Sequence, residues 1–196
     1  MEFTRASLIA APLCFAAYGV IRLIGKMDGQ YGPGVDWQAA HLVNLAGLAL
    51  FVLVVRHLRG KLPGTRGRDI AVVVTLAGVA ATVVQFVVDV VAGLLASDKA
   101  EMNAITGQFA SIPGARLVCY VVGPPLLYVG LLALAVLLVR ARELPWWSPV
   151  LVLAGPALAI VSLDLLPVSG LCLLAALAPL AVRQEGTLPT NDNSLG

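Results

Sequence analysis

The stretch IAVVVTLAGVAATVVQFVVDVVAGLLA, residues 70–96, contains a single ionisable side chain, Asp89. About 20 apolar residues are enough for a helix to cross a bilayer, so this stretch predicts a membrane-spanning helix. The residues other than Ala, Val, Leu, Ile and Phe recur every three or four positions, which places them on one helical stripe. They are Thr75, Gly78, Thr82, Gln85, Asp89 and Gly93. A carboxylate near hydrocarbon costs roughly 2.5–3.5 kcal/mol, so we expect the stripe to face protein.

The composition of the whole chain agrees with a membrane protein. Hydrophobic residues make up 59% and charged residues 12%, values outside the soluble range. A net charge of +2 is too small to indicate nucleic acid as a partner. Cys14, Cys119 and Cys172 each lie in an apolar segment without a CxxC pair or a nearby His. We therefore expect no metal site, no disulfide relay and no cofactor.

Further apolar segments extend the pattern to six spans in an all-α, polytopic transmembrane bundle. The predicted spans are residues 6–25, 37–58, 70–96, 115–139, 148–166 and, after a turn at 167–170, a last helix ending by 182. Asp36 is the expected N-cap of the second span. We expect one transmembrane domain, residues 1–183, followed by a disordered cytoplasmic tail, residues 184–196.

Positive charge predicts the orientation of the bundle. If the six spans alternate, nine of the thirteen Lys and Arg residues fall on one side. They are Arg5, Arg56, Arg59, Lys61, Arg66, Arg68, Arg140, Arg142 and Arg183. The positive-inside rule then places both termini in the cytoplasm of a multi-pass protein of the plasma membrane.

Two short features lie between and within the spans. The segment 98–111 is too polar to span, yet Met102, Ile105 and Phe109 recur at helical spacing, so it predicts an amphipathic helix on the membrane surface. Pro124 and Pro125 remove two backbone donors and predict a kink in the fourth span. Pro156 lies near the middle of the fifth, at a similar depth, so the two kinks could form the floor of a pocket.

Depth along the helices gathers polar side chains into one slab. At 1.5 Å per residue, Arg22, Asp89 and Asp164 lie about 25, 28 and 24 Å from the cytoplasmic start of their helices. The first turns of spans entering from outside carry the remaining members, His41, Asn44, Arg116 and Tyr120. We expect an outward-facing polar pocket with residues 97–113 as its lid and an Asp89–Arg22 ion pair inside it. The alternative is that these charges only tie helices together.

The stretches GPGVDWQAAHL (residues 32–42), QFVVD (85–89) and LPWWSPVLVLAG (144–155), together with the six-span layout, resemble small six-helix membrane proteins of high-GC actinobacteria. The resemblance covers the whole chain and implies a helical bundle. It implies no activity. Integral-membrane terpene cyclases, which use intramembrane carboxylates as proton sources, are an analogy without shared motifs.

Two functional hypotheses from different classes follow. In the first, the polar cluster stabilises the bundle or binds a small lipid or hydrophobic ligand from the bilayer; its ligand-binding residues are Arg22, His41, Asn44, Gln85, Arg116 and Tyr120. In the second, an intramembrane enzyme acts on a prenyl or lipid substrate, with Asp89 and Asp164 catalytic and Asp89 as general acid. An oligomeric transporter is a weaker third, because residues 6–96 and 115–182 show no inverted repeat.

Overall fold

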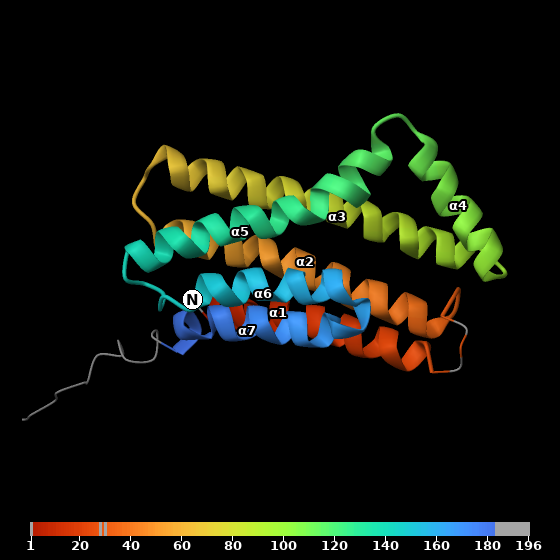
Figure 1. Ribbon diagram of the computed structural model, residues 1–196, viewed down its shortest axis with the longest axis horizontal. Helices are drawn as coiled ribbons and strands as arrows, with labels where there is room; N and C mark the ends of the chain where they lie inside the picture. Colours follow the sequence, from red (N-terminus) through yellow and green to blue (C-terminus); the bar gives the residue numbers. More distant parts are fainter. Residues whose placement is uncertain (1, 28, 30, 183–196) are drawn as a thin grey trace, which may run out of the picture.

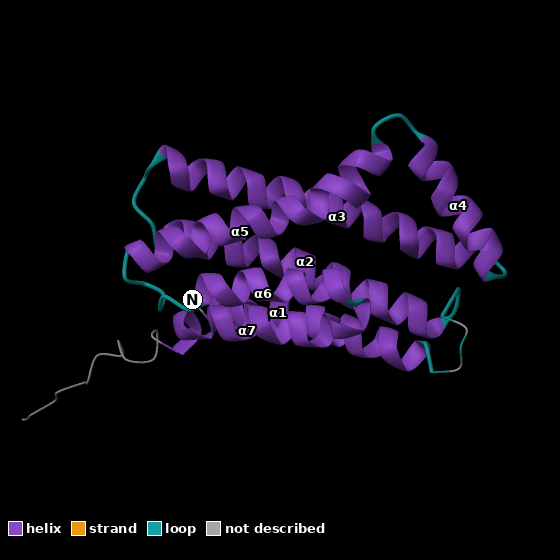
Figure 2. Cartoon of the chain, viewed as in Figure 1, coloured by secondary structure: helices purple, strands orange, loops and turns teal. Residues whose placement is uncertain are grey.

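A computed structural model of the chain describes residues 2–27, 29 and 31–182, apart from the side chains of residues 2–4. Within these ranges all regular secondary structure is helical, as Figure 2 shows. The elements are α1 (Glu2–Gly25), α2 (Val35–Gly60), α3 (Arg66–Leu95), α4 (Lys99–Ser111), η1 (Arg116–Val122), α5 (Gly123–Arg140), α6 (Ser148–Val161), η2 (Leu163–Leu165) and α7 (Leu166–Val182). The predicted tail, 184–196, and Arg183 lie outside the described residues.

The long helices run antiparallel to one another and alternate in direction along the chain (Figure 1). One end of the bundle holds the start of α1, the end of α7 and the connections 61–65 and 141–147; we call it the basic end. The opposite end, which we call the distal end, holds the α1–α2 connection and α4. The described chain therefore starts and finishes at the same end.

Five helical segments of the described chain are long and apolar enough to cross a membrane. They are Arg5–Gly25, Val35–Gly60, Arg66–Leu95, Arg116–Arg140 and Leu163–Val182. The all-α bundle and five of the predicted spans are thus compatible with a multi-pass membrane protein. The remaining one, α6, is apolar but has only 14 residues, fewer than the roughly 20 that a crossing needs.

The α6–α7 junction differs from the predicted one. We expected a helix over 148–166 and a turn at 167–170, but α6 ends at Val161 and α7 begins at Leu166. Ser162 adopts an extended conformation, and its hydroxyl accepts a hydrogen bond from the Asp164 N–H at 3.2 Å. Pro167 lies in the first turn of α7, where a helix does not need the missing N–H. The serine, not the proline, ends the helix.

The predicted stripe on α3 faces protein, as expected. Thr75, Gly78 and Thr82 are buried, and a Cβ added to Gly78 would overlap the Leu127 backbone of α5. At the distal end, a Cβ on Gly93 would lie 2.6 Å from the indole of Trp37 in α2. Small residues therefore let α3 approach both neighbours closely.

The start of α2 also differs in detail from the prediction. Gly34 is the N-cap residue, and Asp36 falls in the first turn instead of capping it. A carboxylate in the first turn still interacts favourably with the positive end of the helix dipole.

The half of the bundle nearer the basic end is filled with apolar side chains; we call it the packed half. Its fully buried residues come mainly from α2, α5 and α7, with Leu8 of α1 and Val152 of α6, and include Phe51, Val54, Val55, Leu58, Leu131, Leu134, Leu138, Leu177 and Leu180. Side chains of this kind pack to crystal-like density, so this half forms the rigid base of the fold.

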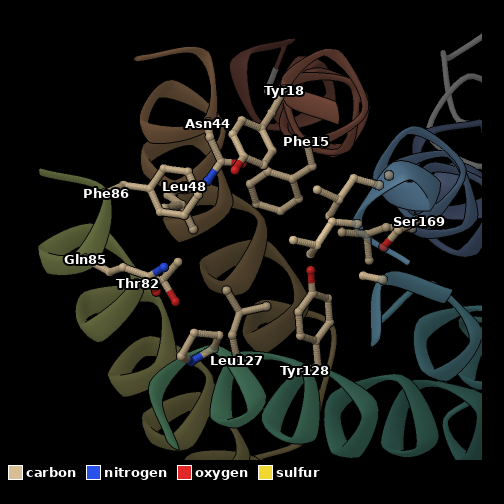
Figure 3. A pocket seen from close by; sticks show the side chains of 16 residues that line it. Phe15, Tyr18, Asn44, Leu48, Thr82, Gln85, Phe86, Leu127, Tyr128 and Ser169 are labelled. Carbon is tan, nitrogen blue, oxygen red and sulfur yellow. The ribbon is translucent and has the colours of Figure 1, made fainter. Parts of the chain in front are cut away.

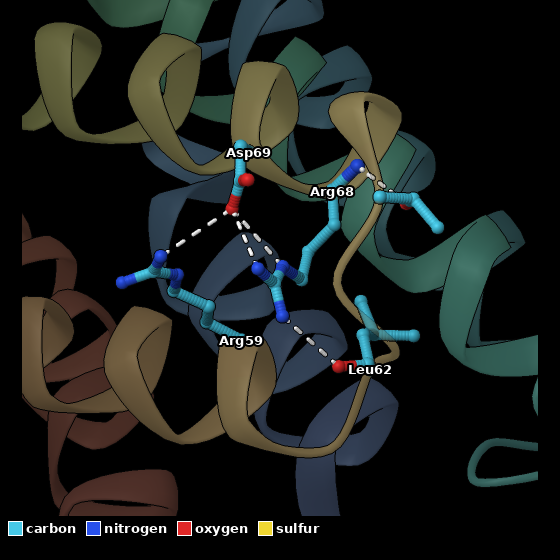
Figure 4. Close-up of polar contacts among 5 residues, drawn as sticks. Arg59, Leu62, Arg68 and Asp69 are labelled. Atoms are coloured by element: carbon cyan, nitrogen blue, oxygen red, sulfur yellow. Dashed lines mark hydrogen bonds and ion pairs between the residues drawn. The ribbon is translucent and has the colours of Figure 1, made fainter.

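Ion pairs close the connection between α2 and α3 at the basic end (Figure 4). The Arg68 guanidinium lies 2.9 Å from the Asp69 carboxylate and donates to the Leu62 carbonyl at 3.2 Å. Arg59 approaches the same carboxylate at 3.5 Å. The Thr65 hydroxyl caps α3 by accepting from the Arg68 N–H at 3.3 Å. The basic residues of this connection are therefore partly ordered by acidic and backbone acceptors.

The prolines of the fourth span mark a change of helix type. Residues Arg116–Val122 form a π-helix, and the Gly123 N–H bonds to the Val118 carbonyl. Figure 1 shows the chain bending where η1 meets α5. Pro124 and Pro125 occupy the first turn of α5 and cannot donate to the preceding turn. The predicted bend is present, and the wider π register accompanies it.

The helix predicted for residues 98–111 is present as α4. Met102 is buried and Ile105 and Phe109 are half-buried, whereas Lys99 and Asn103 are exposed. The helix packs on α3 and η1, so its apolar face is turned toward these two elements.

Candidate functional site

A cavity of about 260 Å³ lies inside the bundle, beyond the packed half and toward the distal end. We call it the inner cavity (Figure 3). Each long element contributes to its wall, which is lined by Phe15, Tyr18, Asn44, Leu48, Thr82, Gln85, Phe86, Pro124, Leu127, Tyr128, Ala159, Leu163, Leu166, Ser169, Gly170 and Leu173. It is therefore formed by the fold as a whole.

Gln85 is the most informative polar group of this wall. Its side chain extends from α3 toward the inner cavity (Figure 3). The amide oxygen is buried and has no hydrogen-bond partner among the described residues. The neighbouring Thr82 hydroxyl donates to the Gly78 carbonyl of its own helix at 2.8 Å and is satisfied. A buried polar atom without a partner typically costs about 1–3 kcal/mol, so Gln85 offers an acceptor that a ligand could use.

The other polar groups around the inner cavity are also uncharged. Asn44 is 6% exposed, and Figure 3 shows it beside Tyr18, with Tyr128 on the opposite wall. Ser169 adds a hydroxyl from α7. The inner cavity thus combines an apolar wall with a few neutral hydrogen-bonding groups, the usual composition of a small-molecule site.

His41 and Asp89 form a separate polar pair next to the inner cavity. The His41 Nδ1 lies 2.7 Å from the Trp37 carbonyl and must donate to it, because a carbonyl only accepts. The other ring nitrogen, Nε2, then faces the Asp89 carboxylate at 3.9 Å. Without a proton between them, Nε2 and the Asp89 carboxylate are both acceptors and repel each other. The contact is therefore favourable when either of these two groups carries a proton.

Aromatic rings enclose this pair. The His41 ring stacks on Trp37 with centroids 4.1 Å apart and contacts Tyr18 and Phe86 at 5.6 and 5.2 Å. The Trp37 indole N–H also donates to the Asp89 carbonyl at 3.0 Å. These contacts fix α2 against α3, so the pair serves helix packing directly.

The ion pairs differ from the expected Asp89–Arg22 pair. Arg22 lies 3.2 Å from Asp164, and Lys26 lies 2.7 Å from the same carboxylate. The reason is the arrangement of the helices: α1 packs on α2 and α7, and over their described lengths α1 and α3 make no backbone contact. The pairing was predicted because Arg22 and Asp89 lie at nearly the same height along the bundle. Height alone does not show which helices lie next to each other.

The structure distributes the predicted site residues over several places. Asn44 and Gln85 line the inner cavity, and His41 and Asp89 form the adjacent pair. Asp164 is half exposed, with a side-chain exposure of 49%, and binds Arg22. These residues therefore do not line one common cavity.

Two further predicted residues lie elsewhere. Arg116 is exposed, and none of the described residues forms an ion pair with it. Tyr120 lines a second cavity between α5 and α6. The expected lid is also placed differently, because none of the described α4 residues is part of the inner-cavity wall.

Sequence reasoning missed several residues of the wall. Tyr128 and Ser169 lie within strongly apolar helices, and nothing in their sequence spacing distinguishes them from ordinary packing residues. Lys26 was read as part of a loop. Among the described residues there is no cluster of three or more His, Cys, Asp or Glu side chains able to hold a metal.

No protein-family model matches the chain, and no curated protein or solved structure is significantly similar to it.

Proposed function

We propose that the protein is a multi-pass protein of the plasma membrane that binds a small hydrophobic ligand with an uncharged polar group in the inner cavity. The observation that carries this proposal is the Gln85 side chain, which lines a largely apolar cavity and whose buried oxygen has no hydrogen-bond partner among the described residues. Structural stability alone would favour an apolar residue at this position, since an apolar isostere needs no partner.

The geometry favours binding over acid catalysis. Neither Asp89 nor Asp164 is among the residues that line the inner cavity. A general acid has to lie within hydrogen-bond reach of the atom it protonates. The Asp89 carboxylate instead faces His41, and Asp164 faces Arg22 and Lys26.

The orientation with six spans and both termini in the cytoplasm is part of the same proposal. It is supported by the basic end, which collects Arg59, Lys61, Arg68 and Arg140, while the alternation of the helices returns α7 to that end. Reporter fusions after Gly64 and after Lys99 test it. We expect a cytoplasmic signal from the first and an external signal from the second, and the opposite result would reverse the orientation.

Native mass spectrometry of protein released from mild detergent tests ligand binding. We expect bound lipid-sized adducts on the wild type and a loss of about tenfold in occupancy for Gln85→Leu, the range of one good hydrogen bond. The matched control is Gln108→Leu on the exposed face of α4. If both variants retain the same adducts, the inner cavity is not the binding site.

A further inference from the structure

A second cavity, of about 540 Å³, lies between α5 and α6, with Tyr120 of η1 at one side. We call it the lateral groove. Its wall is almost entirely apolar, and its outer rim carries exposed side chains, Val129 at 59%, Leu153 at 57% and Ile160 at 86%. In a membrane-spanning bundle, exposed aliphatic side chains at mid-helix face lipid tails. The lateral groove therefore opens toward the bilayer.

The lateral groove adjoins the inner cavity. Pro124 and Tyr128 of α5, Ala159 of α6 and Leu163 of η2 line both. These four side chains form a thin wall between the polar interior and the lipid-facing surface. The proline rings also lack backbone N–H groups, so the helices around this wall bend more easily than regular helices.

The volumes of the two spaces indicate how a ligand is divided between them. Ligand pockets usually have volumes of about 300–1,000 Å³, and the inner cavity, at about 260 Å³, lies below that range. It holds a head group with a few carbons but not a whole lipid. An attached chain has to leave through a wall, and the adjoining space is apolar and larger.

We propose that the ligand is a single-chain lipid with an uncharged head bearing a hydroxyl or amide N–H, which enters from the bilayer between α5 and α6. This inference rests on the proposed ligand-binding function. The head donates to the Gln85 oxygen, and the chain lies in the lateral groove. The Tyr120 hydroxyl, buried without a partner in the described structure, offers a donor along the route.

The charges around the two spaces favour an uncharged head: Arg116 is exposed but lines neither space. Arg22 and Lys26 are the cations of the distal end closest to the α6–α7 junction, and both are held by Asp164. No charged residue belongs to the described wall of either space. Burying an unpaired charge in such a site would cost several kcal/mol, whereas a hydroxyl needs only the acceptor that Gln85 supplies.

Photolabelling of the full chain in phosphatidylcholine vesicles tests the inference. The probe is a monoacylglycerol with a diazirine near the end of its chain. We expect labelled peptides from α5 and α6, at the lateral groove, and protection by excess unlabelled monoolein. Labelling spread evenly over all lipid-facing helices, unaffected by monoolein, would overturn the proposal.

Variants on α6 and α5 test the route. Ala159→Trp fills the shared wall and is expected to reduce specific labelling by about tenfold, whereas Ala157→Trp, exposed on the same helix and outside both spaces, is expected to leave it unchanged. Val129→Trp places a bulky side chain at the exposed rim, where it blocks the same route without crowding the interior. The route can therefore be tested even if Ala159→Trp does not fold. Equal labelling of all three variants would refute the lateral route.

The outcome for Gln85→Leu separates the two proposals. If Gln85→Leu loses monoolein protection while Ala159→Trp and Val129→Trp retain it, the inner cavity binds the lipid but the lateral route is wrong. If Gln85→Leu behaves as the wild type while both tryptophan variants lose labelling, the groove binds a chain without the head-group contact, and the proposed function fails in its present form.

Discussion

Between the basic end and the middle of the bundle, α2, α5 and α7 meet through fully buried residues such as Phe51, Leu134 and Leu177. Nearer the distal end, the same helices surround the inner cavity with Asn44 and Tyr128 among its lining. We call this second region the hollow half. In the hollow half α2 continues, but α5 begins, α6 ends and α7 begins there, so breaks in the helices as well as the choice of side chains shape it.

This difference indicates that the packed half stabilises the fold, whereas the hollow half is suited to binding a ligand. The packed half holds few polar groups: the Thr75 hydroxyl donates to the Ala71 carbonyl at 2.7 Å, whereas the buried Ser148 hydroxyl has no partner among the described residues. The hollow half keeps a buried oxygen on Gln85 to which no described residue donates. A site that must accept a ligand has to leave such groups unpaired in its absence.

The largest expected effect compares one leucine from each half. Leu134→Ala in the packed half should lower the free energy of unfolding by about 2–5 kcal/mol, because a fully buried side chain leaves a new cavity. Leu48→Ala should cost less, since Leu48, although only 1% exposed, already borders the inner cavity and its removal enlarges an existing space instead of creating a new one. Unfolding in detergent, followed by circular dichroism, measures both. Equal losses would mean that the two halves are packed alike.

A second comparison concerns the approach of α3 to α5. Gly78→Ala should destabilise the protein by about 1–3 kcal/mol, because the added methyl group meets the Leu127 backbone, which cannot move aside. Gly67→Ala, at the start of α3 in open space, is the matched control and should be neutral or slightly stabilising. Thermal unfolding of the two variants checks this, and similar melting temperatures would contradict the close contact.

The polar pair of the hollow half is tested by double-mutant cycles. Asp89→Asn and His41→Gln should show a coupling of about 0.5–3 kcal/mol, as contacting residues do. Asp89→Asn and Arg22→Gln should add within about 0.5 kcal/mol, since Arg22 is paired with Asp164. Unfolding free energies of the single and double variants supply the numbers. Strong coupling to Arg22 would restore the pairing that the sequence predicted.

The smallest effect is expected outside both halves, in α4. The Ser97 backbone N–H and hydroxyl donate to the Glu101 carboxylate, both at 2.7 Å, and these bonds lower the pKa of Glu101. A lowered pKa stabilises the folded form above the unfolded value, and that contribution is lost as the pH falls through the folded pKa. The protection factors of the α4 amides, which are corrected for the intrinsic exchange rate at each pH, should therefore fall in acid. Glu101→Gln should remove the pH dependence, and an unchanged profile would contradict this contact.

The regular part of the fold could be predicted from the sequence, because periodicity reports directly on burial. The α3 stripe and the apolar face of α4 were both found in this way. The ion pairs could not be predicted, because rise per residue gives the height of Arg22 but not the neighbours of its helix. The inner cavity was found only through Asn44 and Gln85, since Tyr128 resembles a packing residue until its surroundings are known.

The short helix α6 carries a consequence for the surrounding lipid. At 1.5 Å per residue its 14 residues extend about 21 Å, against a hydrocarbon thickness of about 30 Å. Figure 1 shows α6 stopping short of the distal ends of α1 and α2. Hydrophobic mismatch of this kind is relieved when head groups descend toward the short side, where Lys26 and Asp164 offer charged contacts. The leaflet beside the lateral groove would then be thinned, and bilayer thickness would set how readily a lipid reaches the protein.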